Sequence, residues 1–360
     1  KAVSIGTTGV LGSWTHPLKH TTPDALEIHE LLATLKSNGI DHVALEASSH
    51  GLHQSRLDGV QFSGAGFTNF SHDHLDYHNS LDEYFEAKAL LFRQLLPSDK
   101  TAVINVDDKR IKVFGEELKA IGHSVVTLGV SGEPNIKLKK QSFDSSGQNV
   151  FFEYDGRLYQ KRLNLIGGFQ AQNVLMAAAL VISLGSDPQD VFSVLHNLLT
   201  VKGRMELAAS RANGANVFID YAHTPDAIET AITSLRPHVF GRIIAVIGAG
   251  GDRDQSKRPL MGLAASKTAD VVIVTDDNPR SEDPAKIRQM IIKGIGLGIS
   301  HEFGDRAEAI LRAVDMLDVG DALLICGKGH ETGQVIGEDT LPFDDAEQAS
   351  ISVEALDGVL

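Results

Sequence analysis

Short apolar runs of strand length alternate with segments of helical length and pattern along almost the whole chain. A strand buried on both faces of a parallel sheet reads as a continuous apolar run, and a crossover helix must carry the chain back to start the next parallel strand. The alternation therefore predicts an α/β fold built on parallel sheets. Eight runs read as such strands, at residues 2–5, 42–46, 65–69, 101–105, 217–220, 243–248, 271–275 and 322–326.

Local residue patterns predict one helix, an antiparallel region and two domains. Thr22 reads as the N-cap of a helix with Pro23 at its first position, and Gly39 lies beyond its end. Between residues 136 and 164 the pattern changes to polar, alternating strands, which predict a small antiparallel addition to the first domain. We expect a central domain at residues 1–200 and a second α/β domain at residues 201–360.

Charge and cysteine content exclude several classes of protein. The formal net charge of −14 argues against nucleic acid or an anionic membrane as a partner, because both favour an excess of Lys and Arg. Cys326 is the single cysteine, so no internal disulfide can form, and a reducing, cytoplasmic location is expected. The most apolar helical stretch, residues 174–184, is too short to span a membrane.

Nearly every predicted strand ends in a polar cluster. In chain order these clusters include EASSH, TNFSHDH, DYAHTP, GAGGDRD, TDDNPR and CGKGHE. In open parallel sheets, ligands bind at the carboxyl ends of the strands. Six such clusters in step with the strand pattern predict one site shared between two α/β domains.

Two of these clusters have the composition of a metal site. Glu46 is followed by two hydroxyls and an imidazole, a set that suits Mg²⁺, although Ser and Glu also form helix caps. Residues 71–78 contain three histidines and two aspartates, which could bind a metal or form a polar loop before the helix that starts near Leu81. Lys88 in that helix reads, by itself, as a solvated charge.

Three loops after the later strands point to an anionic ligand. The Gly-rich loop at residues 248–254 can present backbone N–H groups to an anion, although such sequences also form simple tight turns. The loops at residues 277–280 and 327–331 follow the next strands, so we expect the three loops to converge. The 360 residues contain no G-x-x-x-x-G-K-[ST] motif, so the usual phosphate-binding loop is not encoded in them.

Taken together, these strings resemble the Mur ligase family. The resemblance rests on TTPDA, LEASSHGL, TNFSHDHLDYH, EAKALLF, the helix containing Asn173, GRMEL, DYAHTPDA, GGDRDQSKRPLMG, TDDNPR and GKGHE, in the family's order. It implies a central ATPase-like domain with a parallel sheet, followed by a Rossmann-like domain that binds an amino acid. The family also has a UDP-binding domain and a phosphate loop, and we expect both to lie upstream of Lys1.

Within the family, the strings most resemble the members that add meso-diaminopimelate to UDP-MurNAc-L-Ala-D-Glu, with ATP as co-substrate. The implied reaction activates the D-Glu carboxylate as an acyl phosphate, which the amino group of the incoming residue attacks. An L-lysine-adding ligase is one alternative. Folylpolyglutamate synthetase is another, although SSHGL and TDDNPR fit it less well, and a non-catalytic fragment that binds only the amino acid is the third.

The resemblance also assigns roles to residues. Mg²⁺ would be bound by Glu46, His74 and a carbamylated Lys88. The muramyl-dipeptide end of the nucleotide substrate would contact Thr21, Thr22, Ser48, Gln54 and Arg56, while His20 stands where the family often has asparagine. ATP would contact Asn173, Arg204 and Asp220. The incoming amino acid would contact Arg253, Asp277, Asn278, Pro279, Arg280, Gly327 and Glu331.

Arg280 is the residue expected to select diaminopimelate over lysine, which lacks the distal carboxylate. A planar guanidinium can hold that carboxylate with two parallel hydrogen bonds. Glu331, from a neighbouring strand end, would pair with the adjacent ammonium. The alternative is that Arg280 pairs structurally with an acidic side chain close to it in sequence, at Asp276, Glu282 or Asp283.

Overall fold

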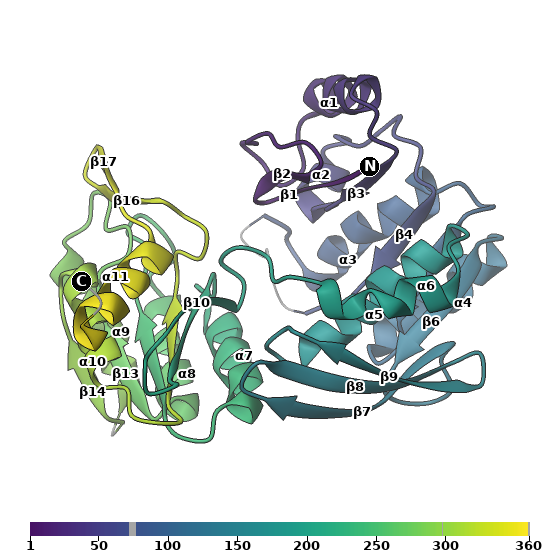
Figure 1. Cartoon of the computed structure of the whole chain (residues 1–360). Helices are drawn as coiled ribbons and strands as arrows, with labels where there is room; N and C mark the ends of the chain where they lie inside the picture. The colour runs from purple at the N-terminus through teal and green to yellow at the C-terminus, as the bar shows by residue number, and fades with distance from the viewer. Residues whose placement is uncertain (72–76, 297, 359–360) are drawn as a thin grey trace. The chain divides into compact units, whose positions relative to one another are not determined.

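The computed structural model describes residues 1–71, 77–296 and 298–358 (Figure 1). Its contacts divide the chain into two compact units, which we treat separately. The first unit comprises residues 1–141, 150–162 and 170–196, and the second comprises residues 142–149, 163–169 and 197–360. The boundary predicted between residues 200 and 201 lies a few residues beyond the start of the last of these segments.

Within the described residues the first unit contains a small sheet and most of a larger one, whose residues 142–144, 147–149 and 163 are grouped with the second unit. The small sheet has the order β2-β1-β3, with β1 (Ala2–Gly6) antiparallel to β2 (Gly9–Gly12) and parallel to β3 (His42–Leu45). The larger sheet runs β4-β5-β6-β7-β8-β9, and the pairs β4/β5, β5/β6 and β6/β7 are parallel. Its strands are β4 (Gly64–Phe67), β5 (Thr101–Asn105), β6 (Ser124–Gly129), β7 (Ile136–Asp144), β8 (Gly147–Tyr154) and β9 (Arg157–Leu163). The strands predicted between residues 136 and 164 are confirmed, and they extend one edge of this sheet.

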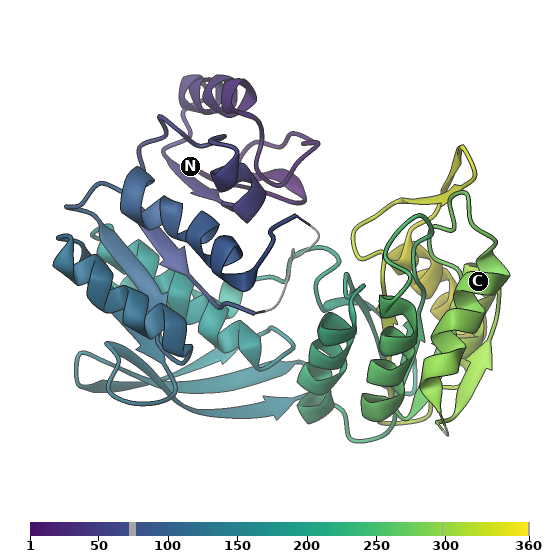
Figure 2. The ribbon, with the colours of Figure 1, turned by 180° about the vertical axis from the view of Figure 1, so that it is seen from behind.

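The helices of this part of the chain fall between the strands, as the alternation predicts. They are α1 (Ala25–Ser37), α2 (Ser49–His53), α3 (Leu81–Leu90), α4 (Lys109–Ala120), α5 (Phe169–Ser183) and α6 (Pro188–Ser193). A π-helical turn, Leu91–Leu95, continues α3, and a 3-10 turn, Leu195–Asn197, follows α6. Both ribbon views show α1 beside the small sheet, away from β7–β9 (Figures 1 and 2).

The prediction that Thr22 caps α1 is wrong. Asp24 is the N-cap, because its carboxylate accepts hydrogen bonds from the N–H groups of Leu26 and Glu27. The Thr22 hydroxyl instead forms hydrogen bonds with the backbone of the loop that follows β3. At the other end the prediction is confirmed: Gly39 follows the helix with a φ of +70°, a conformation that suits glycine.

The second unit is a Rossmann-like α/β domain. Its main sheet has the order β10-β11-β15-β12-β13-β14, in which the pair β10/β11 is antiparallel and the other pairs are parallel. The strands are β10 (Glu206–Ser210), β11 (Asn216–Asp220), β12 (Ile243–Ile247), β13 (Val271–Val274), β14 (Ser300–Glu302) and β15 (Ala322–Cys326), with a separate hairpin of β16 (Gly333–Ile336) and β17 (Asp339–Pro342). The helices are α7 (Pro225–Leu235), α8 (Lys257–Thr268), α9 (Pro284–Ile295), α10 (Arg306–Asp315) and α11 (Asp345–Asp357), and a 3-10 turn, Arg236–His238, follows α7.

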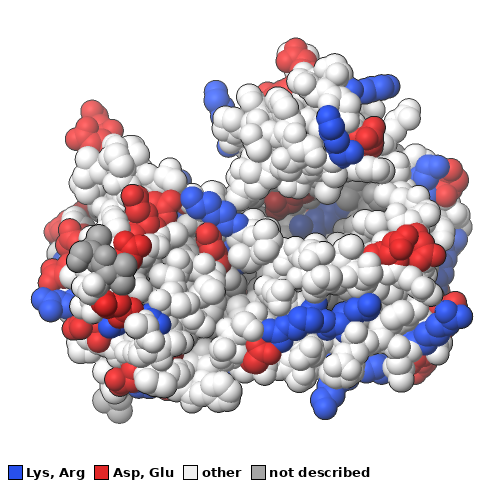
Figure 3. Space-filling view, viewed as in Figure 1, with Lys and Arg blue, Asp and Glu red and all other residues white. Residues whose placement is uncertain are grey.

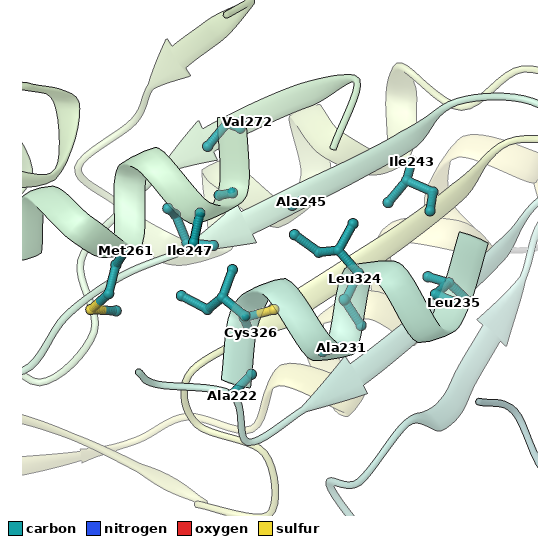
Figure 4. Packing of buried hydrophobic residues seen from close by; sticks show 14 of the residues in the cluster. Ala222, Ala231, Leu235, Ile243, Ala245, Ile247, Met261, Val272, Leu324 and Cys326 are labelled. Atoms are coloured by element: carbon teal, nitrogen blue, oxygen red, sulfur yellow. The ribbon is translucent and has the colours of Figure 1, made fainter. Parts of the chain in front are cut away.

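The central strands of this sheet are buried on both faces, which explains their continuous apolar sequence. Ile243 and Ile247 of β12 pack with Leu324 and Cys326 of β15 under α7 and α8 (Figure 4). Ile244 and Val246 of β12 pack on the opposite face, in the cluster that includes α10 and α11. Cys326 is therefore a core residue, and its burial raises the pKa of its thiol.

Acidic and basic side chains are interspersed on the face drawn in Figure 3, and basic atoms gather over β7–β9. Two lysines there have acidic partners, since Lys137 pairs with Glu133 at 2.8 Å and Lys139 pairs with Glu153 at 2.7 Å. Among the residues that the structure describes, no helix has both the length and the apolar character needed to cross a membrane.

Candidate functional site

Glu46 lies directly after β3, with its carboxylate against the turn that follows β1. Its Oε2 is 3.4 Å from the Thr7 N–H nitrogen and 3.3 Å from the Thr7 hydroxyl, both of which donate to it. A Cβ on Gly6 would lie 2.9 Å from the same oxygen, so a larger residue there would displace the end of the Glu46 side chain. The arrangement holds a carboxylate, the hard oxygen ligand that Mg²⁺ prefers, at the end of a parallel strand.

The Thr22 hydroxyl joins the two sides of this loop. It donates to the Glu46 carbonyl at 2.9 Å and accepts from the Ser48 N–H at 3.0 Å. Arg56 Nη1 donates to the Thr22 carbonyl at 2.8 Å. Thr21, next to it, lies with its hydroxyl 2.9 Å from that of Thr7. The structure thus brings together residues that the sequence predicted for one substrate.

Ser48 and Gln54 have structural partners as well. Ser48 is the N-cap of α2, because its hydroxyl accepts from the Gly51 N–H at 3.1 Å, so the helix-cap alternative is correct for this serine. Gln54 Oε1 accepts two hydrogen bonds from the Arg56 guanidinium, at 3.0 and 2.6 Å, and Gln54 Nε2 donates to the Tyr77 hydroxyl at 3.0 Å. These bonds orient the guanidinium and the amide as one group.

Lys88 lies on α3, half-buried, with its ammonium 4.9 Å from the centre of the Tyr84 ring. It is not the fully solvated charge that its sequence context alone indicates. His74, the other predicted metal ligand, lies outside the described residues. Asn173, predicted to contact ATP, is on α5, where its side-chain amide donates to Gln170 Oε1 at 3.4 Å.

In the second unit, the loop at residues 277–280 is clamped to the β16–β17 hairpin. Arg280 has a φ of +50°, which is uncommon for a residue with a side chain. Its N–H donates to the Val335 carbonyl at 3.0 Å, and its carbonyl accepts from the Gly337 N–H at 2.8 Å. These two bonds hold the backbone in this conformation and so aim the side chain.

The Arg280 side chain reaches the Gly-rich loop. Its Nη1 donates to the Gly251 carbonyl at 2.9 Å, and the Gly251 N–H donates back to the Asn278 carbonyl at 2.8 Å. A Cβ on Gly251 would lie 1.9 Å from the Pro279 carbonyl oxygen, so the glycine permits close packing of the two loops. Arg253, from the same loop, donates to the Asp252 carbonyl at 3.3 Å. The predicted convergence of these loops is confirmed.

The acidic residues proposed as structural partners of Arg280 have partners of their own. Asp276 pairs with Arg288, and Glu282 pairs with Arg258. Asp283 caps α9 by accepting from the Ala285 N–H at 3.0 Å. Arg280 is therefore not engaged in any of the three ion pairs that would make it a structural residue.

Glu282 gives a prediction for stability. Arg258 is buried and donates to both Glu282 oxygens, at 2.9 and 2.7 Å, and these bonds lower the pKa of Glu282 to about 2. The stabilisation from this carboxylate is full above its unfolded pKa of about 4.3 and is lost as the pH falls toward 2. Glu282→Gln should lower the free energy of unfolding at neutral pH, and this difference should shrink in acid.

Urea unfolding of the wild type and the variant at a series of pH values measures this difference. Glu338→Gln, in the turn between β16 and β17, is a control that should change little at any pH. A difference between wild type and Glu282→Gln that stayed constant from neutral pH to pH 3 would contradict the prediction.

Glu331 and Asn278 meet although their strands are not neighbours. We expected Glu331 at a neighbouring strand end, but β15 and β13 are separated by β12. The Asn278 amide nitrogen nevertheless donates to Glu331 Oε2 at 3.0 Å. Gly327, at the end of β15, has a φ of +117°, and a Cβ there would lie 2.5 Å from Asp277 Oδ2. The two loops thus pack against each other over β12.

A buried ion pair fixes the ends of these strands. Arg306 and Asp345 are both fully buried, and Arg306 donates to both Asp345 oxygens at 2.7 Å. The same guanidinium donates to the Cys326 carbonyl at 3.0 Å and to the Asp276 carbonyl at 3.3 Å. Sequence reasoning missed this pair, since its partners are 39 residues apart and neither has a local signal.

The two predicted ATP contacts of the second unit flank Tyr221. The Arg204 guanidinium lies 4.8 Å from the centre of the Tyr221 ring. Asp220 ends β11, and its carboxylate accepts from the N–H groups of Met205 and Ala222, both at 2.9 Å. Burial raises the pKa of Asp220 above its usual value. The Arg204 cation thus stacks on Tyr221, and the neighbouring Asp220 carboxylate is held by two backbone N–H groups.

Two lysines of the motif strings were not singled out from the sequence. Lys257 is half-buried at the start of α8 and donates to the His223 carbonyl at 3.1 Å, and burial lowers its pKa. Lys328 is fully buried beside Asn278 and Glu331. The sequence did contain a signal for Lys328, because it lies between two glycines directly after an apolar strand.

The chain is similar to known proteins along nearly its whole length. Residues 1–181 match the family model of the Mur ligase middle domain, and residues 203–329 match that of the Mur ligase glutamate ligase domain. UDP-N-acetylmuramoyl-L-alanyl-D-glutamate–2,6-diaminopimelate ligase of Caulobacter vibrioides is 44% identical over 366 residues, covering 100% of this chain and 74% of the relative. The ligase of the same name from Agrobacterium fabrum is 46% identical over 359 residues, covering 99% of this chain and 73% of its own.

Solved structures give the same result. A structure of a ligase with this name has a TM-score of 0.72 and 34% identity, and the match covers 99% of this chain and 73% of that one. Folylpolyglutamate synthase of Mycobacterium tuberculosis shares the fold, with a TM-score of 0.67 at 22% identity over 91% of this chain and 70% of that one.

Proposed function

The chain belongs to the Mur ligase family, and from this membership we propose that its strand-end loops carry out the reaction that its relatives are named for. It is an ATP-dependent amide ligase of peptidoglycan synthesis that joins meso-diaminopimelate to UDP-MurNAc-L-Ala-D-Glu. Its substrates are this nucleotide precursor, the amino acid and ATP. The identity of 44–46% to ligases of this name along nearly the whole chain favours it over folylpolyglutamate synthetase.

The chemistry proceeds in two steps. A D-Glu carboxylate oxygen attacks the γ-phosphorus of ATP, and the bond to the β-phosphate oxygen breaks to release ADP and leave an acyl phosphate. An uncharged amino group of the incoming amino acid then attacks the acyl carbon, and inorganic phosphate leaves from the tetrahedral intermediate. The amine gives up one proton as the amide forms. Cationic side chains are needed because a carboxylate must approach a triphosphate.

The proposed amino-acid site depends chiefly on Arg280. Its backbone is fixed by the β16–β17 hairpin, its guanidinium is held by the Gly251 carbonyl, and the nearby acids have other partners. Such a group can donate hydrogen bonds to the distal carboxylate of diaminopimelate. The substrate ammonium beside that carboxylate has Glu331 as its partner. Asp277, Asn278, Pro279, Gly327 and Arg253 form the surrounding loops.

The muramyl-dipeptide end is assigned to the first unit. Thr21, Thr22, Ser48, Gln54 and Arg56 form one hydrogen-bonded group there. The Arg56 guanidinium offers the positive charge that a peptide carboxylate needs. Asn173, Arg204 and Asp220 are assigned to ATP.

The experiment that tests this function is an assay of the full-length protein with ATP and UDP-MurNAc-L-Ala-D-Glu. Mass spectrometry should detect the diaminopimelate amide together with equal amounts of ADP and phosphate. Product with L-lysine at comparable efficiency would identify the lysine-adding ligase instead. Amino-acid binding without any ADP or amide would indicate the non-catalytic alternative.

The residues of the first unit fit a role for Mg²⁺. Glu46 supplies a carboxylate at a strand end, and carbamylation of Lys88 would turn an ammonium into a second anionic oxygen ligand. His74 would complete the set. A bound Mg²⁺ would supply positive charge that offsets the repulsion between the substrate carboxylate and the triphosphate. We also assign the protein to the cytoplasm, where ATP is available.

Glu46 provides a prediction about the metal. Glu46→Gln keeps the shape of the side chain and a hydrogen bond to Thr7 but removes the charge. We expect the Mg²⁺ concentration for half-maximal rate to rise by about tenfold or more, since even outer-shell changes cost about 10–100-fold in metal affinity. The KM for diaminopimelate should stay nearly unchanged, because its contacts lie on other loops.

Steady-state kinetics over a range of Mg²⁺ concentrations measures both quantities. Glu30→Gln, an exposed substitution on α1, is the matched control and should leave both unchanged. His74→Ala should behave like Glu46→Gln. An equal loss of affinity for diaminopimelate in Glu46→Gln would argue against this division of roles.

A further inference from the structure

Lys328 is a buried cation whose function is not explained by the roles above. It follows Gly327 at the end of β15 and has 0% exposed surface. Its ammonium donates to Asn278 Oδ1 at 3.0 Å and lies 3.6 Å from Glu331 Oε2. Burying a lysine is costly unless it is paired and hydrogen-bonded, so these contacts account for its place in the fold.

These contacts determine which way the Asn278 amide points. Its Oδ1 accepts from two donors, the Lys328 ammonium at 3.0 Å and the Val335 N–H at 2.9 Å. An ammonium cannot accept a hydrogen bond, so a flipped amide would place its NH₂ group against two donors. The amide nitrogen must therefore face Glu331, and it donates to Oε2 at 3.0 Å.

Glu331 is held by one of its two oxygens. The Asn278 amide and the Lys328 ammonium both approach Oε2, which leaves Oε1 for another partner. The Glu331 side chain is 36% exposed, unlike the lysine behind it. A carboxylate fixed in this way can present its second oxygen to a ligand ammonium without first losing side-chain freedom.

We propose that Lys328 is a positioning residue for substrate specificity: through Asn278 it orients the Glu331 carboxylate that pairs with the distal ammonium of the amino acid. This inference rests on the proposed function, since it takes Glu331 as the partner of that ammonium. The lysine itself does not touch the substrate. It sets the preference for an amino acid that carries an ammonium beside its distal carboxylate.

The test compares meso-diaminopimelate with 2-aminopimelate, which keeps the distal carboxylate but lacks the distal ammonium. The full-length protein is assayed with both for kcat/KM. Lys328→Met removes the charge and keeps the approximate length of the side chain, and Glu331, the acid it leaves behind, is 36% exposed. It should lower the preference for diaminopimelate by about tenfold or more, the effect of one charged hydrogen bond.

Two further variants separate positioning from folding. Lys328→Gln keeps a donor to Asn278 without the charge and should retain part of the preference, including when Lys328→Met fails to fold. Arg211→Met breaks an ion pair with Asp357 in the same unit and is the stability control. It should lower the melting temperature without changing the substrate preference.

A double variant tests whether Lys328 acts through Asn278. Adding Lys328→Met to Asn278→Ala should cause little further loss of preference, because both substitutions act on Glu331.

The outcomes distinguish this inference from the function it rests on. If the wild type uses both amino acids equally well, Glu331 does not pair with the distal ammonium. A wild-type preference that persists in folded Lys328→Met and Lys328→Gln would overturn the positioning role of Lys328 and leave the function standing. Equal losses for both amino acids in the variants would also overturn it.

Discussion

Lys88→Ala should lose most of the ligase activity, by about a hundredfold or more in kcat. The half-buried Lys88 lies on α3 with its ammonium over the Tyr84 ring, and as a carbamate it would be an anionic metal ligand. Removing one group that stabilises developing charge costs about 10²–10³ in kcat in other enzymes. Short carboxylic acids, added to the assay, should restore part of the activity by supplying the missing carboxylate.

Lys88→Arg distinguishes a carbamate from a simple cation. Arginine keeps the positive charge but cannot be carbamylated under ordinary conditions, so this variant should be as inactive as Lys88→Ala. Lys119→Ala, an exposed lysine in the last turn of α4, is the control and should keep full activity. Wild-type rates in Lys88→Ala would show that this lysine has no part in the reaction.

Arg280→Ala should selectively lose diaminopimelate. Charged hydrogen bonds contribute about 1.5–3 kcal/mol net, and about 1.4 kcal/mol corresponds to a factor of ten. Lysine as substrate would leave the guanidinium without its carboxylate, at a further cost that can reach roughly 2–5 kcal/mol for a buried group. Arg280 is partly exposed and keeps the Gly251 carbonyl, so we expect the lower part of this range.

The measurement is the ratio of kcat/KM for meso-diaminopimelate to that for L-lysine. In the wild type this ratio should exceed about a hundred, and in Arg280→Ala it should fall by most of that factor. Arg312→Ala, an exposed arginine on α10, is the matched control. If Arg280→Ala keeps the preference, or loses both substrates equally, another residue selects the amino acid.

The two specificity residues act on different parts of the same substrate. In the proposed assignment Arg280 would bind the distal carboxylate and Glu331 the distal ammonium, so 2-aminopimelate and lysine would each lack one of the two recognised groups. Lys328→Met should therefore change the preference over 2-aminopimelate more than that over lysine. Arg280→Ala should do the reverse. Measuring both ratios in both variants gives four numbers that the assignment must satisfy.

The sequence by itself determined the strands and the loops that follow them. Each of the eight predicted strands is present. In β12 and β15 the continuous apolar sequence reflects burial on both faces of the sheet. The polar clusters follow these strands because the chain leaves the hydrophobic core at each strand end, where polar side chains can be solvated or bind a ligand. The strands predicted at residues 136–164 were readable because alternating side chains point to opposite faces.

Only the tertiary structure decided how the polar groups pair. Thr22 reads as a helix cap by local rules, yet Asp24 takes that place and the threonine joins Glu46 to Ser48. Arg280 has acids on both sides in sequence, yet its guanidinium meets a glycine carbonyl from a loop 29 residues away. Hydrophobic periodicity is a local property of the chain, whereas a hydrogen bond depends on which loops the packed sheet brings together. The network of Lys328, Asn278 and Glu331 forms because the parallel strands β13 and β15 finish at the same end of the sheet, with β12 between them.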